Sequence, residues 1–286
     1  MKIQSISIVP EKVGCNASCK YCIASMTQTP KSGDRINYDK LSNALQYAIS
    51  GGAQTAIITS KGETLLSDWD YIGNILKYTK EHGFGQRDLH SNMMNVLERK
   101  EEFLEELVKP AYGLTNVTMT LPSMDYTTSK ELMGATTDYD SLFKFLREEA
   151  DLVVRLSCVM NKQGVHDRET IEDYITKAKE KGVNQIVFRG LWVPDNSKHT
   201  KVYDWSVENQ IDASVARTAL EEMVQEGKAY KMFELPWGES VYDVNGVNVS
   251  TSGRCSETKN GVMKSLIYLP DNHVYSDWQY KSSIIF

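Results

Sequence analysis

The chain has 286 residues, of which 41% are hydrophobic and 24% charged, and its formal net charge at pH 7 is −6. This is an ordinary globular composition, sufficient for one large domain or for one domain with an appendage. The acidic balance disfavours a broad nucleic-acid-binding surface, and no apolar run approaches the ~20 residues that a membrane-spanning helix needs. We therefore expect no membrane partner and no nucleic-acid partner.

The cysteine count also bears on the cellular compartment. Five cysteines do not make a disulfide scaffold in a chain of this length, and an odd number fits reduced thiols. The first ten residues, MKIQSISIVP, are too short and too polar for a secretory signal. These features predict a cytoplasmic protein.

Hydrophobic periodicity alternates between that of a strand and that of a helix. Short segments rich in β-branched residues predict six strands, at residues 3–9, 55–60, 87–92, 116–121, 151–160 and 184–192. Apolar residues at helical spacing predict helices at residues 37–50, 68–82, 101–108, 140–150 and 168–182. We expect Ser67 to cap the helix at 68–82.

Strands that alternate with helices predict a parallel sheet with crossover helices. Six such units fall short of a closed eight-unit barrel, so the expected fold is α/β, a partial (β/α)6 TIM-like barrel over residues 1–195. The pattern then changes, because one more helix at 213–227 precedes short segments separated by turns at 245–246 and 271–272. Residues 196–286 are therefore predicted to form a small α+β extension with short antiparallel strands that caps the active site.

The segment VGCNASCKYC carries three of the five cysteines: Cys15, Cys19 and Cys22. A structural zinc site needs four ligands, so His82 or His90 would have to supply the fourth. A [4Fe–4S] cluster held by three thiolates instead leaves one iron open, where a small molecule can bind. A structural or redox group of thiols is the third interpretation.

The spacing Cys15-x3-Cys19-x2-Cys22, directly after the first strand and with Tyr21 before the last cysteine, resembles the signature of the radical SAM superfamily. The resemblance implies a partial (β/α)6 barrel and an oxygen-sensitive [4Fe–4S] cluster whose open iron binds S-adenosylmethionine (SAM). It also implies reductive cleavage of SAM to a 5′-deoxyadenosyl radical that abstracts hydrogen from a substrate. An electron donor such as flavodoxin or ferredoxin would then be a partner.

Further segments resemble motifs of the same superfamily at the ends of the second and third strands. SKGETLL (60–66) is similar to the Gly-Gly-Glu motif, with Gly62 and Glu63 kept and Lys61 in place of the first glycine. By this resemblance Glu63 and the backbone hold the methionyl amine, whereas a plain turn before a helix is the alternative. Ser91 and Asn92 match the motif that follows the third strand.

The last three strands resemble those of the molybdenum-cofactor cyclase and peptide-maturase branches. Thr120 on the fourth strand is a candidate contact to the SAM ribose or carboxylate. Leu191 after the sixth is a candidate contact to the adenine, with core packing as the alternative. On the fifth, Arg155 could pair with the SAM carboxylate, with Ser157 on the same face. The alternative for Arg155 is a surface ion pair. Tyr21 is a further candidate cofactor contact.

The tail resembles the start of an extension that binds auxiliary clusters in several branches, but Cys255 is its only cysteine, and Asp277–Trp278 stands where another is usual. We therefore expect a substrate-binding cap without a second cluster. Cys255 is a candidate catalytic hydrogen donor to the substrate radical, and a structural thiol is the alternative. Cys158 is interpreted as a core residue.

The substrate class is left open between a small molecule and a peptide, which could undergo epimerisation, cyclisation or bond rearrangement. An interpretation from another class is a non-catalytic iron–sulfur or zinc protein with a structural or sensing role. Cleavage of SAM by the reduced protein would distinguish the two.

Overall fold

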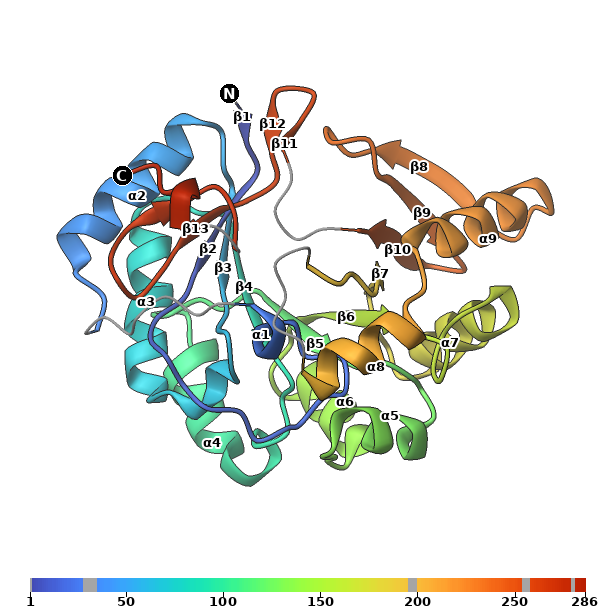
Figure 1. The fold of residues 1–286 in the computed structure, drawn as a ribbon. Coiled ribbons are helices and arrows are strands. Elements are labelled where there is room, and N and C mark those ends of the chain that lie inside the picture. The colour runs from blue at the N-terminus through green and yellow to red at the C-terminus, as the bar shows by residue number, and fades with distance from the viewer. Residues whose placement is uncertain (1, 28–34, 195–199, 254–257, 279–280) are drawn as a thin grey trace. The chain divides into compact units, whose positions relative to one another are not determined.

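The computed structural model describes residues 2–27, 35–194, 200–253, 258–278 and 281–286 (Figure 1). The chain folds into two compact units, each built from segments that are far apart in the sequence. The first unit comprises Met1–Asn16, Gln28–Val117 and Cys255–Phe286. The second comprises Ala17–Thr27 and Thr118–Arg254. The cysteine segment thus contributes Cys15 to the first unit and Cys19 and Cys22 to the second.

The first unit is centred on parallel strands. β2 (Ser5–Ile8), β3 (Thr55–Ile58) and β4 (Gln86–Ser91) pair in that order. On the other side of β2 lies β13 (Leu266–Tyr268), also parallel, and β14 (Val274–Tyr275) pairs antiparallel with β13. A small second sheet contains β1 (Lys2–Ile3), β12 (Val262–Met263) and β11 (Thr258–Lys259).

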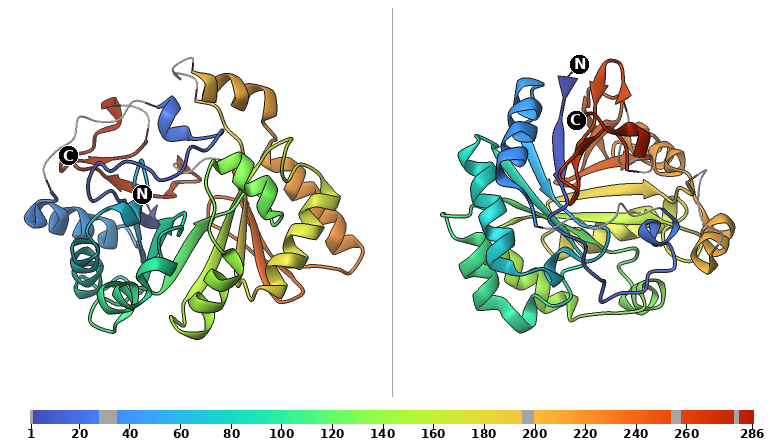
Figure 2. Two further views of the ribbon diagram at one scale, coloured as in Figure 1. Left: turned by 90° about the horizontal axis from the view of Figure 1, so that it is seen from below. Right: turned by 60° about the vertical axis from the view of Figure 1, so that its left-hand side comes forward.

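Two long helices cover one face of these strands, as the right-hand view of Figure 2 shows in blue and cyan. α2 (Tyr38–Ser50) buries Leu41 and Leu45, and its first turn is capped by the side chain of Asn37. α3 (Trp69–Glu81) begins after Asp68, so the prediction that Ser67 caps it is wrong. Ser67 instead ends the 3₁₀ turn Thr64–Leu66, where its N–H donates to the Thr64 carbonyl.

The helix predicted at 101–108 is α4 (Lys100–Phe103), continued by a π-helical turn over Leu104–Val108. β5 (Asn116–Thr120) follows, and its first two residues belong to the first unit and the rest to the second.

The second unit repeats the strand–helix alternation. β6 (Val153–Met160) and β7 (Gln185–Gly190) are parallel, and β10 (Val247–Ser252) continues the sheet parallel to β7. β9 (Ser240–Val244) and then β8 (Tyr230–Glu234) follow, both antiparallel to their neighbours. The turn predicted at 245–246 is present, with both residues at positive φ.

Among the described residues, six helices belong to the second unit. Three were predicted, at nearly these bounds: α6 (Tyr139–Glu148), α7 (Arg168–Glu180) and α9 (Ala213–Gln225). α1 (Ile23–Met26), α5 (Tyr126–Met133) and α8 (Lys201–Asn209) were not.

The predicted antiparallel arrangement of the C-terminal strands is only partly right. β10 and β13 each extend a parallel sheet, and only the hairpins that they form with β9 and β14 are antiparallel. The physical reason is burial: all three residues of β13 are inaccessible to solvent, as is typical of strands inside parallel sheets. The division at residue 195 and the capping role of 196–286 stay predictions.

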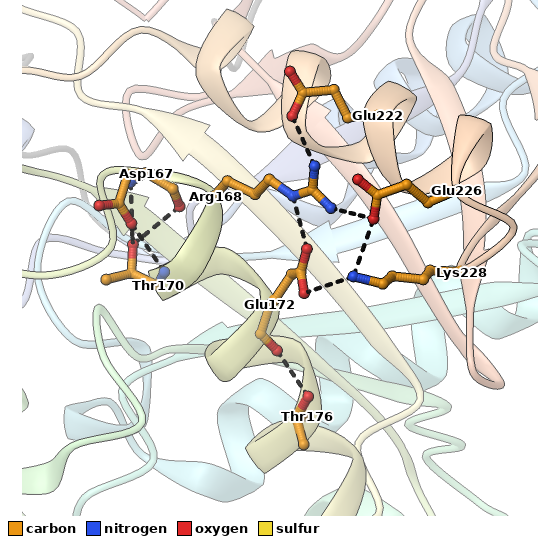
Figure 3. Close-up of polar contacts among 8 residues, drawn as sticks. All are labelled: Asp167, Arg168, Thr170, Glu172, Thr176, Glu222, Glu226 and Lys228. Atoms are coloured by element: carbon orange, nitrogen blue, oxygen red, sulfur yellow. Dashed lines mark hydrogen bonds and ion pairs between the residues drawn. The ribbon is translucent and has the colours of Figure 1, made fainter.

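An ion-pair cluster joins α7 to α9 and the turn that follows it (Figure 3). The Arg168 guanidinium contacts Glu172, Glu222 and Glu226 at 2.8, 3.2 and 2.5 Å. Lys228 lies 3.0 Å from Glu226. Hydrogen bonds from Arg168 and then from Lys228 lower the pKa of Glu226 to about 2, which implies that the cluster stabilises the folded state while this carboxylate is ionised.

The stabilisation by Glu226 is expected to be lost in acid. Because its pKa is depressed in the folded state, the contribution is complete above the ordinary value near 4.5 and disappears as the pH falls toward 2. Glu226→Gln should therefore lower the melting temperature at pH 6, and its difference from wild type should shrink by pH 3. Thermal unfolding followed by circular dichroism tests this, with Glu180→Gln, an exposed α7 carboxylate outside the cluster, as control. A difference independent of pH would contradict it.

No helix in the described ranges combines the length and the apolar character needed to cross a membrane.

Candidate functional site

The SKGE segment contacts the start of the cysteine loop directly. The N–H of Glu63 donates to the Gly14 carbonyl at 2.9 Å. A Cβ atom on Gly62 would lie 2.3 Å from the carbonyl oxygens of both Val13 and Gly14. Such a separation is impossible for a real side chain, so glycine is required here because two backbone segments approach closely. The absence of a side chain at Gly62 thus allows the SKGE segment to pack against the backbone that leads into Cys15.

Glu63 links the ends of β3 and β4. Its Oε1 accepts hydrogen bonds from the Leu65 N–H at 2.9 Å and from the Ser91 hydroxyl at 2.6 Å, and its Oε2 accepts from the Asn92 N–H at 2.7 Å. The side chain is only 2% exposed. Burial raises the pKa of Glu63, and the three hydrogen bonds oppose that shift. Because a carboxylate accepts about four hydrogen bonds, Oε2 keeps one acceptor position for a further donor.

Asn92 extends this network to the cysteine loop. Its side-chain amide donates to Asn16 Oδ1 at 2.7 Å, and its own oxygen accepts from the Met94 N–H at 3.0 Å. Asn16 is the residue after Cys15. Four residues predicted from sequence, Gly62, Glu63, Ser91 and Asn92, are therefore brought together beside Cys15 within the first unit.

Lys61, which departs from the superfamily motif, contacts the tail within the same unit. Its ammonium group lies 3.3 Å from the carbonyl oxygen of Trp278, whose ring packs on the buried cluster of Val9, Ile267, Leu269 and Tyr275. Burial lowers the pKa of Lys61, and the charge of Asp277 opposes this. Lys61 therefore connects the SKGE segment to the C-terminal segment that contains Trp278.

In the second unit, the other half of the cysteine loop is bound to the end of α5. The N–H groups of Ser18 and Lys20 donate to the carbonyls of Met133 and Leu132, at 2.8 and 2.9 Å. Gly134 ends α5 in the left-handed conformation, with φ of 69°. These bonds hold Cys19 between two anchored neighbours, and the Cys22 N–H donates to the Cys19 carbonyl at 3.2 Å.

Two buried tyrosine hydroxyls accompany Cys19. The hydroxyls of Tyr21 and Tyr139 have no hydrogen-bond partner among the described residues. Burial raises the pKa of Tyr21, and it raises the pKa of Tyr139 to about 12; in both cases the charge of Cys19 raises it further. Both phenols are therefore neutral donors, of the kind that stabilises a thiolate.

The predicted residues on the later strands lie along the β6–β7 ladder. Arg155 Nε donates to Gln185 at 2.8 Å, and Ser157 accepts from Arg189 Nε at 2.8 Å. Arg155 and Ser157 share a face of β6 because they are two residues apart on that strand. Thr120 ends β5, and Leu191 is buried just after β7, where its N–H donates to the Ile211 carbonyl.

Comparison with known proteins decides the fold. No protein-family model matches the sequence, and no curated protein matches it either. The structure is similar to that of Streptococcus suis SuiB bound to S-adenosylmethionine, with a TM-score of 0.64 and 16% identity over 97% of this chain and 60% of that one. It is also similar to anSMEcpe with bound AdoMet, with a TM-score of 0.59 and 14% identity over 99% of this chain and 77% of that one.

The chain has the radical SAM fold. The predicted fold class, α/β with a partial (β/α)6 TIM-like barrel, is confirmed. The maturase HydG of the [FeFe]-hydrogenase is similar over a shorter part, with a TM-score of 0.53 and 13% identity over 77% of this chain. The chain spans about 60% of the length of the SuiB structures that it matches.

Two of the matched structures contain bound S-adenosylmethionine, and in this chain three thiols are the donors expected for an iron–sulfur cluster. Cys15 is exposed, and Cys19 and Cys22 are half-buried. Cys15 belongs to the first unit, and Cys19 and Cys22 belong to the second. Within the described ranges, no three His, Cys, Asp or Glu side chains lie close enough together to hold a metal ion. The fit therefore rests on the three thiols and the neutral phenols beside Cys19.

Two further cysteines, Cys158 and Cys255, lie outside the cysteine loop. Cys158 on β6 is fully buried, its thiol lies 3.6 Å from the Pro122 carbonyl, and burial raises its pKa, which suits the predicted core role. Cys255, the candidate hydrogen donor, lies outside the described residues.

Three residues of this radical SAM fold were missed as site residues. Asn16 could have been found from its position between two cysteines, and Arg189 from the polar alternation of β7. Tyr139 had no sequence signal, because nothing in the chain order places the start of α6 near Cys19.

Proposed function

We propose that the chain is a radical SAM enzyme that holds a [4Fe–4S] cluster with Cys15, Cys19 and Cys22. The observation that carries this proposal is the close approach of Gly62 to the loop before Cys15, with Glu63 joining that loop to Ser91 and Asn92. The segment that resembles a SAM-binding motif packs against the start of the cysteine loop. When bound, the cluster and SAM supply a 5′-deoxyadenosyl radical that removes hydrogen from a substrate.

The chain's own residues would position the cofactor. The remaining acceptor position on Glu63 Oε2 suits the methionyl amine, and its buried carboxylate supplies the negative charge. Tyr21, Thr120, Arg155, Ser157 and Leu191 are the proposed contacts to the rest of SAM. The Tyr21 and Tyr139 hydroxyls would donate to the Cys19 sulfur, which favours its thiolate form.

The substrate is proposed to be a peptide or a small molecule. A second structure of SuiB, bound to its precursor peptide SuiA, matches this chain with a TM-score of 0.62 and 16% identity. Similarity at this level supports a peptide as one class of substrate. Residues 196–286 would cap the site, Cys255 would return a hydrogen atom, and flavodoxin or ferredoxin would donate electrons. An oxygen-sensitive cluster and reduced thiols suit the cytoplasm.

The cluster assignment is tested by anaerobic reconstitution with iron and sulfide. We expect about four irons per chain, and an electron paramagnetic resonance signal of the reduced cluster that changes when SAM is added. Alanine at Cys15, Cys19 or Cys22 should abolish that signal, whereas Cys158→Ala, which changes a core thiol, should keep it. Zinc bound in place of iron would support the non-catalytic alternative.

A further inference from the structure

The strand β8 presents an open edge. It is the last strand in the hydrogen-bonded order of its sheet, and it pairs only with β9 among the described strands (Figure 1, orange). All five of its residues are exposed, including three large side chains: Tyr230, Met232 and Phe233 are 70%, 52% and 53% exposed. Unpaired backbone groups flanked by exposed apolar side chains form a template for another strand.

The two faces of β8 differ in chemistry. Lys231 lies opposite Tyr242, whose hydroxyl donates to Glu221 of α9, so this is the face that α9 covers. A bulge at Met232 shifts the register, so that Glu234 lies on the same face as Lys231, 3.9 Å from it. Tyr230 and Phe233 lie on the other face, opposite Asp243 and Val241.

The order of these side chains is self-complementary. In a two-fold antiparallel pair of identical strands, residue i lies opposite j and j opposite i. When Lys231 lies opposite Glu234 of a second copy, Glu234 lies opposite Lys231, and Met232 lies opposite Phe233. Both charge pairs then share the α9 face, and both apolar pairs share the other face.

This register is selected by charge. A shift of two residues in either direction places Lys231 or Glu234 opposite an apolar side chain and leaves the other charge without a cross-strand partner. Lysine and bulges commonly protect sheet edges, but in this register Lys231, which already lies 3.9 Å from Glu234 of its own chain, also lies opposite Glu234 of a second copy. An unrelated peptide would need a matching charge pattern, which a second copy supplies by symmetry.

We propose that two copies of this chain associate through antiparallel pairing of their β8 strands, with Lys231 opposite Glu234 in both directions. The contact involves five residues per copy, which is small, so the dimer is weak and depends on concentration. The proposal is independent of the proposed catalytic function.

Sedimentation velocity over a concentration series of the full chain tests this pairing. Wild type should show a monomer–dimer equilibrium, and Lys231→Glu or Glu234→Lys alone should weaken association by about tenfold or more, because each places like charges opposite in both pairs. Mixing the two single variants should restore dimers to near the wild-type level. In that mixture a chain with two glutamates faces a chain with two lysines.

The mixture also controls for an effect on folding. Each single variant lacks the Lys231–Glu234 ion pair within its own chain, both alone and in the mixture, so restored association cannot come from a change in folding. That exposed pair contributes little to stability, and circular dichroism should show unchanged melting. A wild type that stays monomeric at all concentrations would overturn the proposal. So would a mixture that remains as dissociated as the single variants.

Discussion

Gly62→Ala is expected to displace the cysteine loop and to slow SAM cleavage by about a hundredfold, since misplacement of a reacting group by about 1 Å has effects of this size. The added methyl group would lie 2.3 Å from two backbone carbonyl oxygens, and backbone cannot rotate away as a side chain can. The expected loss of stability is about 2 kcal/mol or more, the cost of overpacking a buried contact. Thermal unfolding and the rate of 5′-deoxyadenosine formation measure the two effects.

Gly85→Ala is the matched control, because a Cβ atom there meets nothing within 4 Å and the residue is not at positive φ. It should melt within a few degrees of wild type and retain activity. If Gly62→Ala behaved like Gly85→Ala, the close packing of the motif on the cysteine loop would be wrong.

Glu63→Ala is expected to reduce stability by about 3 kcal/mol and to abolish SAM binding. Removing the carboxylate leaves the N–H groups of Leu65 and Asn92 and the Ser91 hydroxyl without their acceptor, and each unsatisfied buried donor costs about 1–3 kcal/mol. Water entering the cavity would recover part of that cost. Chemical denaturation and equilibrium binding of SAM measure the two losses.

The conservative change Glu63→Gln separates shape from charge. The glutamine keeps one acceptor oxygen, so its loss of stability should be intermediate, while the lost negative charge should still weaken SAM binding by about tenfold or more. Glu98→Gln, at an exposed position of the same unit, should change neither quantity. Unchanged SAM affinity in Glu63→Gln would show that the carboxylate has only a structural role.

Much of the fold could be predicted because burial sets a clear period in the sequence. α2 and α7 were placed to within about two residues, since each has an apolar stripe and a polar cap, Asn37 and Asp167. α5 and α8 escaped prediction because few of their residues are buried, so their apolar pattern is weak. The parallel pairing of β10 and β13 depends on partners distant in sequence, which local patterns do not reveal.

Part of the candidate site could likewise be predicted from the sequence, and part could not. Gly62, Glu63, Ser91 and Asn92 could be predicted because their segments resemble superfamily motifs, and they lie together because the ends of parallel strands meet at one edge of a sheet. The hydrogen bond of Asn92 to Asn16 could not, because it depends on the path of the loop after Cys15. The unpartnered hydroxyl of Tyr139 is likewise a product of tertiary packing.

Reductive cleavage of SAM is the most direct test of the central claim. Anaerobically reconstituted protein, given dithionite and SAM, is predicted to release 5′-deoxyadenosine, measured by liquid chromatography and mass spectrometry. The Cys15→Ala, Cys19→Ala and Cys22→Ala variants should release none, and Cys158→Ala should release it at near the wild-type rate. A protein that assembles the [4Fe–4S] cluster but cleaves no SAM under any reductant would contradict the account.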